Sequence, residues 1–184
     1  MKVTAVLITW KRQQNIPKIV ENILQYQFID EILIRDNSKG DNLKTWARYE
    51  LAKQAKNDII YTQDDDCVIP IDKIFNKFDG NVITYGGTPE SVNNSYHKRL
   101  CLMGWGSFFK KEWLNVFDKY ESKYGRDYLF YREADRIFTT LQPTLHKPVI
   151  VEIEHLDAIG GVAMSAEQEH VSTRNEAVNR CLNL

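Results

Sequence analysis

The sequence predicts an α/β protein in which helices flank a mostly parallel central sheet. Apolar segments rich in β-branched residues predict three buried strands, at residues 3–9, 31–35 and 58–62. Two segments whose apolar residues recur with helical periodicity separate these strands, at residues 16–24 and 43–56. Strands and helices that alternate in this order form parallel sheets with right-handed crossover connections.

The two helices of the first half have recognisable ends and apolar faces. Asn15 is placed to cap the first helix, and Pro17 lies in its first turn, where proline costs little. The apolar stripe of this helix consists of Ile16, Ile19, Val20, Ile23 and Leu24. That of the second helix consists of Leu43, Trp46, Ala47 and Leu51. A cluster of turn-forming residues at 36–41 ends the second strand.

The second half of the chain is less regular. After a short helix opened by Pro70, we expect a strand at 81–85, helices at 110–120 and 133–141, a strand at 148–154 and a polar helix from about residue 167. The 184 residues contain no internal repeat and no linker-like tract. A single domain over residues 1–184 is therefore expected.

Composition excludes several classes of protein. With 24 Lys+Arg against 25 Asp+Glu, the chain is not a globally basic nucleic-acid-binding domain. It has no apolar run long enough to span a membrane, and its apolar stretch at 3–10 lacks the features of a secretory signal. The three cysteines are widely spaced and form no CxxC pair, which argues against a disulfide framework and a structural zinc site. We expect a cytoplasmic protein with reduced thiols.

Polar residues follow each predicted strand, at 10–12, 36–37 and 64–66. Ligands of open parallel sheets bind at the carboxyl ends of the strands, so these three segments should lie close together. The adjacent carboxylates of Asp64, Asp65 and Asp66 repel one another unless a cation offsets their charge. A solvated acidic turn is the alternative, but the position after a buried strand favours Mg²⁺ or Mn²⁺, with phosphates completing the coordination shell.

The neighbouring strand ends carry residues suited to a nucleotide. Lys11 and Arg12 supply positive charge for a diphosphate, although they could also be solvated loop residues. Asp36 could accept hydrogen bonds from a base or ribose, or act as a turn residue or helix cap.

Five segments, in order, resemble motifs of GT-A nucleotide-sugar glycosyltransferases of the family-2 type, which carry a DxD motif. Residues 6–12 resemble the first-strand motif, with Thr9, Trp10 and Arg12 at its threonine, aromatic and arginine positions. The other segments are 34–41, similar to the second-strand loop that faces the nucleobase; 63–66, similar to the DxD motif; 104–112, similar to the glycine–aromatic–basic segment beside the sugar and acceptor; and 132–136, where an acidic motif opens a helix.

This resemblance implies a short, single-domain GT-A-like fold and a metal-dependent glycosyltransferase. The donor would be a nucleoside-diphosphate sugar, with a UDP-sugar favoured. The nucleotide-binding half would cover about residues 1–87, and the acceptor and catalytic half about residues 88–184. The donor-binding residues would be Thr9, Trp10, Lys11, Arg12, Asp36, Asn37, Asp64 and Asp65.

The resemblance also implies roles at the metal and the sugar. Asp66 is the first choice as ligand of Mn²⁺ or Mg²⁺, with Asp64 on the metal or the ribose, and His155 stands where many such enzymes supply a third ligand. The segment beside the sugar and acceptor contains Gly104, Trp105 and Gly106. Trp105 could stack on a sugar or base, or pack in the core.

The catalytic base is placed less sharply, because the adjacent Glu-Asp pair of the family is split here by Ala134. Either Glu133 or Asp135 could occupy the base position. We favour Asp135, since the apolar residues that follow it suit the inward side of a helix. A carboxylate there would deprotonate the acceptor hydroxyl if the reaction inverts configuration.

The acceptor hydroxyl could belong to a saccharide, a lipid-linked glycan or a hydroxylated base of DNA. The DNA alternative rests on a local basic rim, expected at the carboxyl edge of the sheet from Lys11, Arg12, Lys98, Arg99, Lys110, Lys111, Arg126, Arg132 and Arg136. Scattered solvated charge is the simpler interpretation.

Three other classes remain as rivals or are excluded. A sugar nucleotidyltransferase would carry a glycine-rich loop after the first strand, where this chain has no glycine in residues 9–14. A dinucleotide dehydrogenase is disfavoured for lack of a GxGxxG motif. A degenerate transferase fold that only binds a nucleotide or carbohydrate is the non-enzymatic alternative, left open by the altered acidic motif at 133–135.

Overall fold

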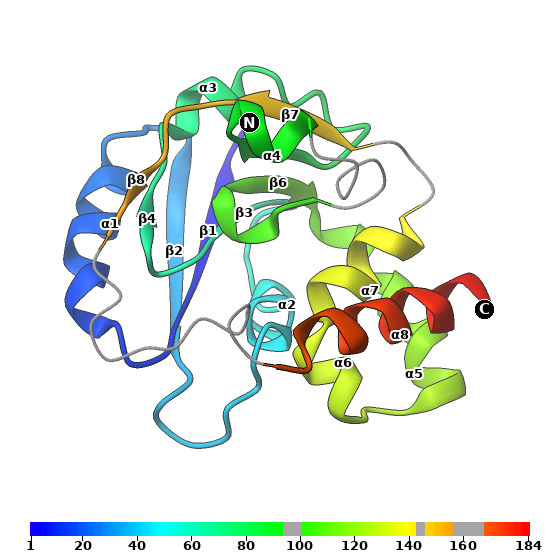
Figure 1. Ribbon diagram of the computed structural model, residues 1–184. Helices are drawn as coiled ribbons and strands as arrows, with labels where there is room; N and C mark the ends of the chain where they lie inside the picture. The colour runs from blue at the N-terminus through cyan, green and yellow to red at the C-terminus, as the bar shows by residue number, and fades with distance from the viewer. Residues whose placement is uncertain (94–100, 143–145, 157–167) are drawn as a thin grey trace.

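The computed structural model describes residues 1–93, 101–142, 146–156 and 168–184, and places a six-stranded sheet at the centre of the molecule (Figure 1). The strand order is β2-β1-β3-β6-β5-β7. In chain order these strands are β1 (Val3–Thr9), β2 (Ile29–Asp36), β3 (Ile59–Gln63), β5 (Thr84–Gly87), β6 (Ser107–Lys110) and β7 (Lys147–Ile150). Only β6 runs against the other strands of this sheet. The expected mostly parallel α/β architecture is confirmed.

The first three strands carry the expected polar segments to one edge of the sheet. Thr9 at the end of β1 pairs with Asp36 at the end of β2, and Leu7 pairs with Gln63 at the end of β3. Every residue of β3, and all of β1 except Ile8, is buried. Burial on both faces explains why these strands are continuous apolar runs rather than alternating ones.

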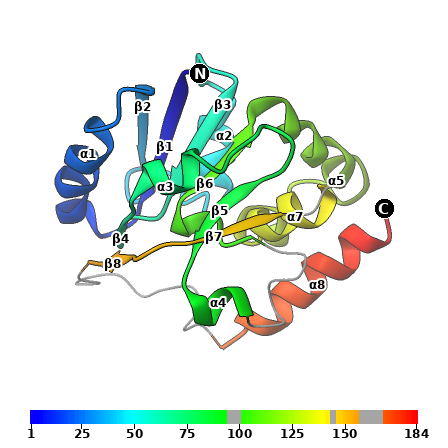
Figure 2. The same cartoon turned by 90° about the horizontal axis from the view of Figure 1, so that it is seen from above.

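Helices cover both faces of the sheet. On one face, α1 (Ile16–Leu24) and α3 (Ile71–Phe75) pack in a core with Val3, Ala5 and Leu7 of β1. The opposite face is covered by α2 (Trp46–Ala52), α5 (Val116–Tyr124), α6 (Tyr128–Arg132), α7 (Ala134–Leu141) and α8 (His170–Leu182). This second core is rich in aromatic residues, including Trp46, Tyr49, Phe117, Phe130 and Phe138. Figure 2 shows α8 beside α7, on the far side of the molecule from α1.

A separate two-stranded sheet brings the late part of the chain to the end of β3. Its strands are β4 (Cys67–Val68) and β8 (Glu154–His155), which lie antiparallel with His155 opposite Cys67. The Leu156 backbone N–H donates to the carbonyl of Asp66 at 2.7 Å. Both views show this pair near α1 (Figures 1 and 2).

Several expected elements differ in extent. Asn15 does stand at the N-cap of α1, but its side chain caps nothing there and instead donates to the backbone of Asp65. The second helix is shorter than residues 43–56, and the strand expected at 81–85 lies at Thr84–Gly87. The late strand expected at 148–154 is split into β7 and β8, which belong to different sheets.

The segment at 110–120 is the largest departure from expectation. Residue 110 ends strand β6, a 3₁₀ turn follows at Lys111–Asn115, and α5 begins only at Val116. Neither strand β6 nor helix α6 was expected from the sequence. The four residues of β6, which lie between a glycine and a lysine, are too few to show a strand pattern, and they form a strand because they pair with β3 and β5. The remaining short elements are η1 (Gln13–Asn15), η3 (Met103–Trp105) and α4 (Pro89–Asn93). Among the described residues, no helix has the length and apolar character needed to cross a membrane.

Candidate active site

Asp65, the middle carboxylate of the acidic run, ties the end of β1 to the end of β3. Its Oδ2 accepts hydrogen bonds from Thr9 Oγ1 at 2.8 Å and from the Trp10 backbone N–H at 3.0 Å. Its Oδ1 accepts from Arg12 Nη1 at 3.0 Å, and its backbone carbonyl accepts from Asn15 Nδ2 at 2.9 Å. Asp65 is therefore a buried, paired charge that anchors the loop after the first strand.

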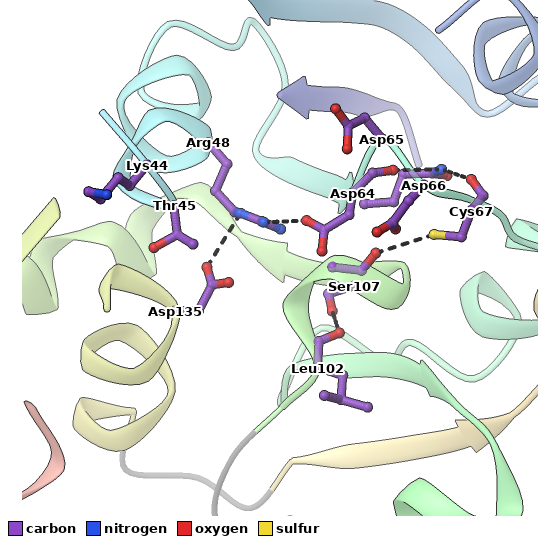
Figure 3. A network of polar contacts seen from close by, with 12 residues as sticks. Lys44, Thr45, Arg48, Asp64, Asp65, Asp66, Cys67, Leu102, Ser107 and Asp135 are labelled. Carbon is purple, nitrogen blue, oxygen red and sulfur yellow. Dashed lines mark hydrogen bonds and ion pairs between the residues drawn. The ribbon is translucent and has the colours of Figure 1, made fainter. Parts of the chain in front are cut away.

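Asp64 and Asp66 have different partners: Asp64 points toward Arg48 of α2 (Figure 3), and Asp66 shares Arg12 Nη1 with Asp65. Their side chains are 39% and 30% exposed, against 9% for that of Asp65. Partial burial and the neighbouring charge of Asp64 raise the pKa of Asp66, although Arg12 opposes this effect. Burial is the largest of these influences and, with the charge of Asp64, outweighs the effect of Arg12.

Asp135 joins this group through Arg48 of α2. Arg48 Nη2 donates to Asp64 Oδ1 at 2.6 Å, while its Nε lies 3.3 Å from Asp135 Oδ1 (Figure 3). The same Asp135 oxygen accepts a hydrogen bond from Tyr49 Oη at 2.8 Å. Burial raises the pKa of Asp135, and the charge of Arg48 is the strongest of the influences that lower it.

These contacts define a cluster that we call the acidic site. Arg12 Nη1 pairs with Asp65 and Asp66, each at 3.0 Å. The site as a whole consists of four carboxylates and two guanidinium groups, namely Asp64, Asp65, Asp66, Asp135, Arg12 and Arg48. When all six are ionised, two negative charges remain without a counter-charge among them. One divalent cation would balance that excess.

The exposed carboxylates of the acidic site fit a Mg²⁺ or Mn²⁺ ion. Such ions often bind one or two carboxylates and take water and substrate phosphates as their other ligands. Within the described part of the chain, no three His, Cys, Asp or Glu side chains are grouped to hold a metal by themselves. His155 is exposed, and its ring packs edge-on against Trp105 at 5.8 Å. Asp64 and Asp66 are thus the residues that would hold the ion, with most ligands supplied from elsewhere.

The basic residues after β1 are placed differently from each other. Arg12 is buried and engaged with the acidic site, so its guanidinium does not face solvent. Lys11 is exposed, has a positive φ of 62°, and holds its ammonium 4.4 Å from the centroid of the Trp10 ring. A positive φ is uncommon for a residue other than glycine and is often found at functional sites. Lys11, unlike Arg12, is therefore accessible from solvent.

Asp36 and Asn37 shape the loop after β2. Asp36 Oδ1 accepts from Gln13 Nε2 and from both the backbone and hydroxyl of Ser38, and the hydroxyl bond is the main reason its pKa is lowered. Asn37 is buried and donates to the Lys44 carbonyl at 3.1 Å. In this structure Asp36 is thus a turn residue, which is the alternative role expected from the sequence. Its carboxylate lies at the carboxyl edge of the sheet.

Gly104 allows Asp64 to take its position. The Gly104 carbonyl accepts from the Asp64 backbone N–H at 2.8 Å. A Cβ at Gly104 would lie 1.9 Å from Asp64 Oδ2, closer than any real contact. Gly106 has a φ of +82° and is packed against Ile69, so a side chain there would be both strained and crowded. Trp105, between them, is half-buried against His155.

Glu133, the other candidate base, lies away from the acidic site. Its Oε1 accepts a hydrogen bond from Thr173 Oγ1 of α8 at 2.8 Å and lies 3.2 Å from Arg132 Nε. Only 6% of its side chain is exposed, and this burial raises its pKa. Glu133 thus joins α6 and α7 to α8, whereas Asp135 lies among the acidic-site residues.

Of the expected basic rim, Lys11 is exposed at the carboxyl edge, whereas several other members that the structure describes lie elsewhere or are buried. Because β6 is antiparallel, Lys110 pairs with Ile59 at the amino end of β3, opposite the carboxyl edge. Arg132 and Arg136 are buried. Lys98 and Arg99 lie outside the described residues.

Sequence reasoning missed Arg48 and Tyr49. Arg48 lies outside the apolar stripe predicted for the second helix, so helical periodicity assigns it to the solvent side and gives no signal of its burial. Nothing in the sequence could have assigned its partners, because Asp135 lies in another helix.

Comparison with known proteins supports the fold. No family model and no curated protein matches the sequence. The structure is similar to the inositol-1-phosphate CTP transferase from T. maritima, with a TM-score of 0.55 and 12% identity over 97% of this chain and 98% of that one. It is also similar to residues 1–349 of S. aureus TarS, solved in complex with UDP-GlcNAc, with a TM-score of 0.57 and 11% identity over 100% of this chain and 67% of that one. The chain therefore shares its α/β fold with the CTP transferase and with TarS.

Proposed function

We propose that the protein is a metal-dependent glycosyltransferase that moves a sugar from a nucleoside-diphosphate sugar, with a UDP-sugar favoured, to an acceptor hydroxyl. Residues 1–87 or so would bind the nucleotide, and about 88–184 would receive the acceptor. The similarity to TarS, solved with UDP-GlcNAc, supports the donor class.

The observation that carries this proposal is the charge and placement of the acidic site. Two partly exposed carboxylates, Asp64 and Asp66, follow the central strand β3, and the six ionised groups of the site leave two negative charges unbalanced. A divalent ion would balance these charges and draw the donor diphosphate to the strand edge, where Lys11 is exposed. A solvated acidic turn would not require two buried arginines.

The residues of this chain divide the chemistry between binding and proton transfer. Asp64 and Asp66 would hold Mg²⁺ or Mn²⁺, which when bound supplies Lewis-acid stabilisation of the departing diphosphate. Lys11 would add positive charge at the same diphosphate. Asp135 would accept the proton of the acceptor hydroxyl, since its carboxylate is held beside Asp64 with 23% of its side chain exposed. Glu133 would anchor α8 rather than react.

Ligand-induced thermal stabilisation tests the donor class. With Mn²⁺ and UDP at about 100 times Kd, binding should add about 2.7 kcal/mol to the free energy of unfolding. For a chain of this size the Tm should rise by about 5–10 °C. GDP and CDP should give smaller shifts, and Asp66→Ala should abolish the effect. Asp118→Ala, which removes an exposed acid on α5, is the matched control and should retain it. If no nucleotide raises the Tm of the wild type, the proposal is wrong.

A sugar nucleotidyltransferase is the second candidate. The CTP transferase similarity favours it, because that match covers nearly the whole of both chains. The two reactions release different products: a glycosyltransferase releases a nucleoside diphosphate from a nucleotide sugar, and a nucleotidyltransferase releases pyrophosphate from CTP or UTP and a phosphorylated substrate. Pyrophosphate release with CTP or UTP and a sugar 1-phosphate, without UDP release from UDP-GlcNAc, would favour the second candidate.

A further inference from the structure

Arg48 connects the donor side of the acidic site to the candidate base. Its side chain is 2% exposed, with Nη2 on Asp64 and Nε near Asp135. Within the described residues, these two carboxylates are the partners of its side chain: Nη2 donates a hydrogen bond to Asp64, Nε forms an ion pair with Asp135 without a hydrogen bond, and Nη1 makes no hydrogen bond. The two acids come from different parts of the fold, at the end of β3 and the start of α7.

Stability alone is a weak reason for this arrangement. Burying a guanidinium costs desolvation energy that an ion pair often fails to repay, so an apolar side chain could stabilise α2 equally well. Arg132 provides a contrast, because its hydrogen bonds and ion pair with Thr173, Tyr128 and Glu133 join packed helices to one another. Arg48 instead ends on partly exposed carboxylates.

The contacts of α2 also fix which oxygen of Asp135 is available. Arg48 Nε and Tyr49 Oη, from adjacent residues, both approach Oδ1 of Asp135, at 3.3 and 2.8 Å. No contact of the other oxygen, Oδ2, is found within the described part of the chain. A carboxylate held through one oxygen by a hydrogen bond and an ion pair keeps a set orientation of its second oxygen, which is the geometry a general base requires.

We propose that Arg48 is a positioning residue for the transfer reaction: by bridging Asp64 and Asp135, it aligns the base carboxylate with the donor side of the site. Tyr49 assists by holding the same oxygen of Asp135. This inference rests on the proposed function. It means that helix α2 aligns Asp64, on the donor side of the site, with Asp135, the candidate base.

The test separates turnover from binding. Arg48→Met keeps an unbranched side chain but removes the charge. With UDP-GlcNAc and Mn²⁺ as the probe and water as the acceptor, kcat for UDP release should fall by about 100-fold, the effect of a misplaced catalytic group. The Kd of Mn²⁺–UDP, measured by calorimetry, should not increase. Arg48→Lys should keep the fold but recover little kcat, because one ammonium cannot hold both carboxylates in a fixed fork geometry.

A double-mutant cycle distinguishes positioning from a general structural defect. If Arg48 acts through Asp135, Arg48→Met should have little further effect on kcat in an Asp135→Asn background. Tyr49→Phe should lower kcat by a smaller factor and should also lose its effect in that background, which keeps the test valid if Arg48→Met does not fold. Arg126→Met, which removes an exposed arginine stacked on Trp46 of α2, is the matched control and should leave kcat unchanged.

The outcomes separate the two proposals. If the wild type neither binds Mn²⁺–UDP nor releases UDP, the proposed function fails. If the wild type is active but Arg48→Met weakens Mn²⁺–UDP binding as much as it lowers kcat, or lowers kcat equally in the Asp135→Asn background, the positioning role is overturned. A crystal structure of Arg48→Met in which Asp135 keeps its orientation would also overturn it.

Discussion

The two arginines of the acidic site lie in contrasting surroundings. Arg12 pairs with two adjacent residues, Asp65 and Asp66, and the Asp65 carboxylate also accepts hydrogen bonds from Thr9 and Trp10. Arg48 pairs with two acids that are distant in sequence, Asp64 and Asp135, and both are partly exposed. Within the Arg12 cluster the Asp65 carboxylate is buried and fully paired, whereas Asp66 and the two acids on Arg48 retain carboxylate oxygens that a ligand can reach.

This contrast distinguishes two kinds of carboxylate within one site, those that stabilise the fold and those that remain available to react. A buried carboxylate with every oxygen paired has little capacity left to bind a ligand, and its removal strands a buried cation. A partly exposed carboxylate with one oxygen held is oriented and still available. The four predictions below test this division, beginning with the largest expected effect.

Replacing the candidate base should give the largest change in activity. Asp135→Asn keeps the shape of the side chain and its bond from Tyr49, so the fold should persist while UDP release from UDP-GlcNAc falls by about 10²- to 10⁴-fold. Glu133→Gln is the matched control. It should keep its turnover and lose about 1–3 kcal/mol of stability, because its partners are buried. Equal losses of turnover in both variants would contradict the assignment of Asp135.

Removing Asp65 should give the largest change in stability. Asp65→Ala leaves Arg12 buried with only Asp66 beside it, and should lower the free energy of unfolding by about 3–5 kcal/mol. Asp64→Ala should cost clearly less stability, since the Asp64 side chain is 39% exposed, yet it should weaken Mn²⁺–UDP binding. Urea unfolding and calorimetry measure the two effects. A larger stability loss in Asp64→Ala than in Asp65→Ala would reverse the comparison.

A methyl group at Gly104 should displace Asp64 without removing it. Gly104→Ala places a Cβ against Asp64 Oδ2, and this overpacking should cost about 1–3 kcal/mol. Mn²⁺–UDP binding should weaken with it. Gly125→Ala is the control, because Gly125 has a φ of +69° but nothing within 4 Å of an added Cβ. It should lose about 1–3 kcal/mol to backbone strain, because its ψ is −170°, and leave binding unchanged. If Gly104→Ala binds Mn²⁺–UDP as tightly as the wild type, the position of Asp64 does not matter for binding.

The smallest expected effect is a dependence of stability on pH. The folded-state pKa of Asp66 is raised, so the folded protein holds this proton more tightly than the unfolded chain does. The resulting stability is present below the unfolded pKa of about 4 and is lost as the pH rises through the folded pKa. Without metal, wild type should therefore lose stability relative to Asp66→Asn as the pH rises above about 4. Urea unfolding between about pH 4 and pH 7 measures this difference.

Bound Mn²⁺–UDP should reverse that dependence. A metal-binding carboxylate must be deprotonated, so affinity should increase with pH over the same range. Calorimetry at several pH values measures it, and an affinity that falls as the pH rises would argue against Asp66 as a ligand.

Much of the fold and part of the site follow from the sequence. Continuous β-branched runs and helical periodicity predicted β1, β2 and β3 and the helices between them, because local propensity and burial act over short segments. The rule that polar residues gather at the carboxyl ends of parallel strands predicted that Trp10, Asp36 and the acidic run lie at one edge of the sheet. That rule depends only on strand direction, and the register of Thr9 with Asp36 confirms it.

The partners of each charge were decided by the tertiary structure. Three adjacent aspartates look equivalent in the sequence, yet in the turn after β3 Asp65 contacts the end of β1 and Asp64 contacts α2. The reversed direction of β6 moved Lys110 to the far edge, and packing of α8 engaged Glu133. Propensity and periodicity describe one segment at a time. Which buried arginine meets which carboxylate depends instead on how segments distant in the sequence pack together, and in this protein that packing separates the scaffold from the candidate base.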